Sequence, residues 1–219
     1  MDLTTYITAD LKVLSLTDKL GRAKALFLAC SFSHLPIVKD NQLIGLIAEN
    51  DFQDIELNED LIEKHLDLIQ HFSTLNTNVW INLIKLFATN RTNILPVIDD
   101  KQRYLGYYEL NDILQRFLET PFLNEGGYLI IVEKNILEYS FSEISQIVEA
   151  NNAKILGAFI TKRVGDTVQI TLKISDHDIS NTLQSFRRYN YHVIAGNIED
   201  QYFEQLKERS EYLQKYLNI

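Results

Sequence analysis

The chain has 219 residues, of which 46% are hydrophobic and 11% aromatic, so it can build one or two packed domains and is not a disordered protein. Its 30 acidic residues outnumber 21 basic ones, and the net charge of -9 disfavours nucleic acid and anionic membrane as partners. The apolar runs are shorter than the roughly 18 residues of a membrane span. The first residues also lack the features of a signal peptide, so we expect a cytoplasmic protein.

One pattern occurs twice in the first half of the chain. Each copy has a Leu-Pro step in a short apolar stretch, then a glycine, then an Asn-Asp pair. The copies consist of Leu35, Pro36, Gly45, Asn50 and Asp51, and of Leu95, Pro96, Gly106, Asn111 and Asp112. The prolines are 60 positions apart and the glycines and aspartates 61, which indicates two copies of one supersecondary unit. We expect the functional site to lie between the copies.

Both copies predict the same order of elements, namely a helix, a two-stranded hairpin and a further helical segment. In the first copy the helix starts at Thr17 and Asp18, the strands cover 35–38 and 43–47, and Asn50 and Asp51 cap the next helical segment. In the second copy the helix starts at Thr77, the strands cover 95–98 and 104–108, and a helix covers 113–118. Such a unit leaves one sheet face uncovered, so we expect the copies to pack against each other.

The pattern changes at Pro121 and at the glycine pair 126–127, which indicates a domain boundary. The remainder predicts the order β-α-β-β-α-β, a split βαβ sandwich. The expected strands are 128–132, 155–160, 168–174 and 191–195. Ser140 and Glu143 form a capping box at the start of the first helix, and the tail from Asp200 has helical periodicity.

The duplicated pattern resembles a tandem pair of CBS domains, and the β-α-β-β-α-β segment resembles an ACT domain. Together they are similar to the small bacterial CBS-ACT proteins of the acetoin-utilisation type. The resemblance implies an α/β (α+β) fold with tandem CBS repeats and a ferredoxin-like ACT domain. The expected boundaries are 1–120 for the pair (1–58 and 59–120 for the repeats), 121–127 for a linker, 128–198 for the ACT-like domain and 199–219 for a terminal helix.

The resemblance also implies a regulatory protein without enzymatic activity. CBS pairs bind adenosine nucleotides or other adenosyl ligands between the repeats, so AMP, ADP, ATP or S-adenosylmethionine is the expected regulatory ligand, with no required cofactor. We expect a homodimer and an unidentified protein partner. The alternative is a ligand-independent homo-oligomeric scaffold with degenerate CBS and ACT pockets. No catalytic or metal-binding motif occurs in the sequence, and we expect no metal.

The family motif ends in an aspartate whose carboxylate accepts hydrogen bonds from two ribose hydroxyls, and Asp51 and Asp112 match it. A simple helix cap is the alternative role for each. Three positions earlier the family has a hydroxyl residue that holds phosphate, but this chain has Ala48 and Glu109. A carboxylate at ~4 Å from a phosphate costs about 4 kcal/mol at an effective dielectric near 20.

Family phosphate contacts also come from residues just before the Leu-Pro step. These are Ser33 and His34 in the first copy and Asn93 in the second. Only His34 could carry a positive charge, and a partly exposed turn residue is its alternative role. The first copy is therefore the better candidate for a nucleotide site.

Overall fold

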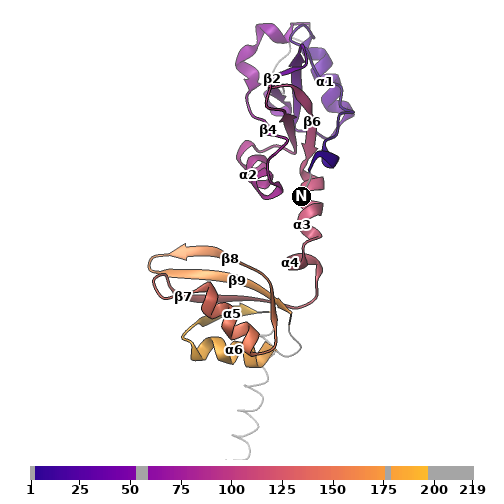
Figure 1. The fold of residues 1–219 in the computed structure, drawn as a ribbon. Coiled ribbons are helices and arrows are strands. Elements are labelled where there is room, and N and C mark those ends of the chain that lie inside the picture. The colour runs from indigo at the N-terminus through magenta and orange to yellow at the C-terminus, as the bar shows by residue number, and fades with distance from the viewer. Residues whose placement is uncertain (1–2, 53–58, 176–178, 197–219) are drawn as a thin grey trace, which may run out of the picture. The chain divides into compact units, whose positions relative to one another are not determined.

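The computed structural model describes residues 3–52, 59–175 and 179–196. The predicted C-terminal helix, 199–219, lies outside the described residues. The chain divides into two compact units, Met1–Phe117 and Leu118–Ile219, which are described separately below (Figure 1).

The first unit contains the two copies of the repeated pattern, each with a helix, a hairpin and a helical turn or helix. The first repeat comprises α1 (Leu20–Ala29), β1 (His34–Lys39), β2 (Gln42–Ala48) and the 3-10 turn η2 (Glu49–Phe52). The second comprises α2 (Trp80–Asn90), β5 (Ile94–Ile98), β6 (Tyr104–Glu109) and α3 (Leu110–Leu118). Short elements of the unit are η1 (Thr4–Tyr6), η3 (Ile62–Lys64), η4 (Leu66–Leu68), β3 (Ile69–Gln70) and β4 (Thr74–Leu75).

Two segments connect the repeats by crossing from one to the other. The first lead segment, residues 7–14, pairs through Thr8 with Tyr107 of β6 and then through Leu14 with Ile37 of β1. The second lead segment, residues 69–75, pairs through β3 with β2 and then through β4 with β5. Each lead segment therefore contacts both repeats, and the described part of the unit has two three-stranded sheets in the orders β1-β2-β3 and β4-β5-β6.

The duplicated glycines allow each lead segment to lie close to the hairpin with which it pairs. A Cβ on Gly106, whose φ is +137°, would lie 2.4 Å from the carbonyl oxygen of Thr8. A Cβ on Gly45 would lie 2.4 Å from Cγ2 of Ile69 and 2.7 Å from the carbonyl oxygen of Gln70. Each lead segment therefore approaches its hairpin at the one residue type that has no side chain.

Each repeat has its own apolar core. The first core contains Leu14, Leu20, Ala23, Phe27, Leu35, Ile37, Ile47 and Ile62. The second contains Leu3, Leu83, Phe87, Leu95, Val97, Tyr108 and Ile113. Residues of the lead segments or their flanks, Leu14 and Leu3, are buried in these cores, so the exchange is stabilised by apolar burial as well as by backbone pairing.

The second unit is a four-stranded antiparallel sheet in the order β10-β7-β9-β8, with α5 and α6 on one of its faces (Figure 1). Its elements are α4 (Pro121–Asn124), β7 (Tyr128–Asn135), α5 (Phe141–Ala150), β8 (Lys154–Val164), β9 (Thr167–Ser175), α6 (Ile179–Arg188) and β10 (His192–Gly196). Alternate strand residues such as Val168, Ile170 and Leu172 are buried in the core beneath the helices. The predicted β-α-β-β-α-β order and fold class are confirmed.

Several predicted helix starts are corrected by the structure. Helix α1 begins at Leu20 with Lys19 at its N-cap and no side-chain cap, because Asp18 instead accepts a hydrogen bond from the Ser15 N–H (2.7 Å). Asp51 and Asp112 are third in η2 and α3, so neither stands at the N-cap that we predicted. The capping residue of α5 is confirmed: Ser140 Oγ accepts a hydrogen bond from the N–H of Glu143 (3.3 Å).

Candidate functional site

Four polar side chains form a continuous row beside β2, and we call this row the first site. Ser33 Oγ lies 2.8 Å from Nδ1 of His34, and Nε2 of His34 lies 3.4 Å from Oε1 of Gln70. Nε2 of Gln70 then donates a hydrogen bond to Oδ2 of Asp51 (3.1 Å). Strand β1 positions His34, Ser33 directly precedes this strand, η2 positions Asp51, and the second lead segment supplies Gln70. The row thus combines three residues of the first repeat with one residue of the second lead segment.

One protonation pattern satisfies this row. If His34 is neutral with its proton on Nε2, it donates to Gln70 and accepts from the hydroxyl of Ser33, which then does not donate to Oδ1 of Asn93, 3.0 Å away. The amide nitrogen of Gln70 then donates to the Asp51 carboxylate, which can only accept hydrogen bonds when it is ionised. The hydrogen bonds therefore all run in one direction and end on Asp51.

His34 is neutral at physiological pH. Its side chain is only 5% exposed, and burial lowers its pKa, with the hydrogen bond to Gln70 and the charge of Asp51 opposing that effect. The ring also packs edge-on against Phe72, with 5.3 Å between ring centroids. Our interpretation of His34 as a partly exposed turn residue was therefore wrong, because it is a buried residue of β1.

Ser33 and Asn93 join the two repeats by reciprocal hydrogen bonds, which we call the Ser33–Asn93 bridge. The N–H of Ser33 donates to Oδ1 of Asn93 (2.8 Å), and the N–H of Asn93 donates to Oγ of Ser33 (3.1 Å). Asn93 Nδ2 also donates to the carbonyl of Ser31 (2.7 Å). The two residues hold equivalent places, 60 positions apart, in the duplicated pattern. Groups that the resemblance assigns to phosphate are thus already used between the repeats.

The second site, around Asp112, is acidic. The Tyr107 hydroxyl donates a hydrogen bond to Oδ1 of Asp10 (2.6 Å), and the backbones of Tyr107 and Thr8 exchange two bonds of 2.9 Å. The pKa of Glu109 is raised by burial and by the charges of Asp112 and Asp10. The carboxylates of Asp112 and Asp10 are therefore both close enough to Glu109 to disfavour its charged form.

The structure separates the predicted site residues into these two groups. It brings Ser33, His34 and Asp51 together with Asn93, and it pairs the buried Ala48 with His34 across the β1–β2 hairpin. Glu109 and Asp112 lie in the second site instead.

Sequence reasoning missed Asp10 and Gln70, which come from the lead segments. Only the pairing of Thr8 with Tyr107 and of Gln70 with Leu46 reveals that these segments are equivalent. At equivalent places the two segments repeat an isoleucine, Ile7 and Ile69, which is too common a residue to have identified them.

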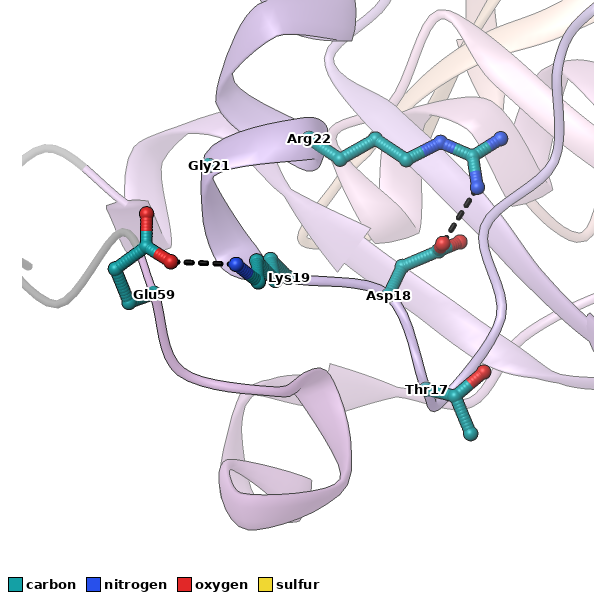
Figure 2. A pocket seen from close by; sticks show the side chains of 6 residues that line it. All are labelled: Thr17, Asp18, Lys19, Gly21, Arg22 and Glu59. Carbon is teal, nitrogen blue, oxygen red and sulfur yellow. Dashed lines mark hydrogen bonds and ion pairs between the residues drawn. The ribbon is translucent and has the colours of Figure 1, made fainter.

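A separate surface hollow of about 400 Å³ lies at the start of α1, and Figure 2 shows its lining. It is lined by Thr17, Asp18, Lys19, Gly21, Arg22 and Glu59. Lys19 pairs with Glu59 and Arg22 with Asp18, each at 2.5 Å, so both cations are already neutralised by a carboxylate (Figure 2). None of the duplicated motif residues lines this hollow.

The described part of the chain contains neither a metal-binding cluster nor a membrane-spanning helix. Residues 3–52, 59–175 and 179–196 contain no group of three or more His, Cys, Asp or Glu side chains that could hold a metal ion. No helix within these ranges is long and apolar enough to cross a membrane.

No known family profile matches the chain. It is similar to inosine-5'-monophosphate dehydrogenases from Thermoplasma acidophilum (24% identity over 58% of this chain) and Methanocaldococcus jannaschii (27% over 66%). The matches cover 26% and 29% of those enzymes, so the chain spans less than a third of their length. A solved CBS domain pair/ACT domain protein from Thermotoga maritima is 16% identical, with a TM-score of 0.48 over 54% of this chain and 98% of that one. The fold assignment rests on the strand orders described above.

Proposed function

We propose that the chain is a regulatory protein that binds an adenosine nucleotide or another adenosyl ligand in the first site. The observation that carries this proposal is the position of Asp51 at the end of a row of polar side chains from the first repeat and the second lead segment. A carboxylate can accept hydrogen bonds from both hydroxyls of a ribose, and its matching place in the duplicated pattern supports that role. The resemblance to CBS pairs, drawn from the sequence, supplies the ligand class.

Ribose binding at Asp51 would compete with Gln70. The amide of Gln70 now occupies Oδ2 of Asp51, so a ribose hydroxyl would replace one hydrogen bond by another. Gln70 belongs to the second lead segment, which crosses between the repeats. Its release is therefore a direct route by which a ligand shifts the arrangement of the repeats, and through them a homo-oligomer or protein partner.

The phosphate groups would contribute little to this affinity. His34 is neutral, and the backbone N–H groups of Ser33 and Asn93 are bonded within the protein. The nucleoside portion should thus dominate, and AMP, ADP and ATP should bind within about tenfold of one another, which is about 1.4 kcal/mol. S-adenosylmethionine, which shares the adenosyl group and has no phosphate, should bind in the same range.

Titration calorimetry with each of the four ligands tests the proposal. Asp51→Asn keeps the shape of the side chain and the acceptor oxygen for Gln70, but it removes the charge that ribose hydroxyls require, so it should weaken binding at least tenfold. Asp112→Asn is the matched control, because it makes the same change in the equivalent place and should leave the affinity of the first site unchanged. Absence of heat from all four ligands at millimolar concentration would refute nucleotide sensing.

The alternative function is a ligand-independent homo-oligomeric scaffold, and Tyr107 is the observation that favours it. This side chain is 2% exposed, packs edge-on against Phe32 at 5.3 Å between centroids, and bonds to Asp10. A buried tyrosine therefore occupies space between the first lead segment and the second repeat. Light scattering and thermal unfolding of the purified protein, with and without the four ligands, separate the functions: a scaffold keeps one mass and one melting temperature throughout.

A further inference from the structure

The two sites have the same backbone plan, which allows residue-by-residue comparison. Gly45 faces Gln70 of the second lead segment, and Gly106 faces Thr8 of the first. Leu46 and Tyr107, the residues that follow these glycines, pair with Gln70 and Thr8 in turn. Gln70 and Thr8 therefore hold equivalent places.

Two residues farther along each lead segment, the sites differ in charge. In the first site this place is Phe72, whose ring packs against His34. In the second site it is Asp10, whose carboxylate accepts the hydrogen bond from Tyr107. Tyr107 is buried, and its backbone N–H and carbonyl both form hydrogen bonds with Thr8. The position of the hydroxyl that donates to Asp10 is therefore fixed by the packing and backbone pairing of Tyr107.

The hairpin strand adds a second charge difference. Glu109 follows Tyr107 by two residues on β6, and side chains two apart on a strand lie on the same face. The equivalent residue of the first repeat is Ala48, which is buried and uncharged. The raised pKa of Glu109, which arises from burial and from Asp112 and Asp10, supports the proximity of Glu109 to each of these two carboxylates.

These carboxylates oppose any anionic ligand. A phosphate placed ~4 Å from one carboxylate, at an effective dielectric near 20, loses affinity by on the order of a thousandfold. In the first site Asp51 is the one carboxylate of the row, and in the family arrangement it faces the ribose. The second site has two further carboxylates beside the equivalent Asp112.

We propose that Asp10 and Glu109 are specificity residues that exclude phosphate-bearing ligands from the second site, so that each chain takes one nucleotide, in the first site. This inference rests on the proposed function for the ligand class. It assigns Asp10, a residue outside the duplicated motif, to the second site by its hydrogen bond to Tyr107 and by the pairing of its segment with β6.

The test is the stoichiometry of ATP binding to the full chain by titration calorimetry. The wild type should bind one ATP, and the double variant Asp10→Asn/Glu109→Thr should bind two. Asn retains the oxygen that accepts from Tyr107, and Thr supplies a hydroxyl at the place where the carboxylate was. A control, Glu63→Gln/Asp67→Asn, removes two exposed charges from the same unit and should still bind one ATP. Unfolding curves check that each variant is folded.

Placing the double variant in the Asp51→Asn background assigns the new binding to its site. Asp51→Asn alone should bind no ATP at the concentrations used, and the triple variant should bind one. Two molecules of ATP on the wild type, or no additional ATP on the folded double variant, would overturn the inference. Should the wild type bind no ATP, the proposed function fails, and a gain of one ATP in the double variant would still establish the exclusion.

Discussion

The first and second sites occupy equivalent backbone positions and have opposite side-chain character. The first contains a neutral buried histidine, an amide and one carboxylate, whereas the second contains a tyrosine hydroxyl and three carboxylates. In both sites a glycine of the hairpin lies against a lead segment that pairs with the same hairpin. The two copies thus share one backbone framework and differ in the few side chains placed on it, which in the proposed function set the choice of ligand.

Substitution of the two duplicated glycines should have the largest effect on the free energy of unfolding. Gly106→Ala would push a Cβ against the Thr8 carbonyl oxygen and require a positive φ, so it should destabilise the unit by roughly 3 kcal/mol. Gly45→Ala meets a side chain and a carbonyl oxygen without a positive φ, and should cost about 2 kcal/mol. Denaturant unfolding measures both.

Gly126→Ala is the control for this pair, because a Cβ there would meet nothing within 4 Å and no unusual φ is needed. It should change the free energy of unfolding by less than about 0.5 kcal/mol. If Gly106→Ala were as stable as this control, the close approach of the first lead segment would not exist in solution.

The Ser33–Asn93 bridge should have the next largest effect. Asn93→Ala removes the acceptor of the Ser33 N–H and the donor to Ser31, so it should cost about 1–3 kcal/mol. Asn82→Ala is a suitable control, since the exposed side chain of Asn82, in the first turn of α2, donates a hydrogen bond to Oδ1 of Asn78 (3.1 Å). A smaller loss in Asn93→Ala than in the control, measured by urea unfolding, would show that the bridge contributes nothing to the contact between repeats.

The smallest effects are pH dependences of opposite sign in the two sites. The pKa of His34 is lowered in the folded state, so the free energy of unfolding should fall as pH decreases below the ordinary histidine pKa of about 6.5. His34→Gln should reduce that fall. The pKa of Glu109 is raised, so its charge destabilises the folded state above its folded pKa, and the penalty disappears once pH is below the ordinary glutamate value of about 4.3.

Melting temperatures measured between pH 4 and 8 distinguish the two cases. Glu109→Gln should be more stable than wild type at pH 7–8, and the difference should shrink toward pH 4. His71→Gln, which replaces an exposed histidine near β2, is the control for the loss of an imidazole at His34. A stabilising effect of Glu109→Gln that grew on acidification would contradict the raised pKa.

Much of the fold could be predicted from the amino-acid sequence. The prolines, glycines and aspartates at fixed spacing indicated two copies of one hairpin unit, and apolar periodicity indicated the β-α-β-β-α-β order of the second unit. These signals are local, because strand alternation and turn residues reflect conformational preferences over a few neighbours. The same signals misplaced the start of α1, where Asp18 bonds to Ser15 and not to the helix.

The two sites show where prediction from sequence ended. Asp51 and Asp112 were found from the duplicated motif, and the difference between Ala48 and Glu109 was visible in the sequence. Only the tertiary structure decided three other features. These are the burial that favours neutral His34, the hydrogen bond from Gln70 to Asp51, and the position of Asp10 beside Tyr107. Asp10 and Tyr107 are 97 positions apart, and only the exchange of the lead segments brings them together, because side chains in distant segments meet through packing that no local pattern specifies.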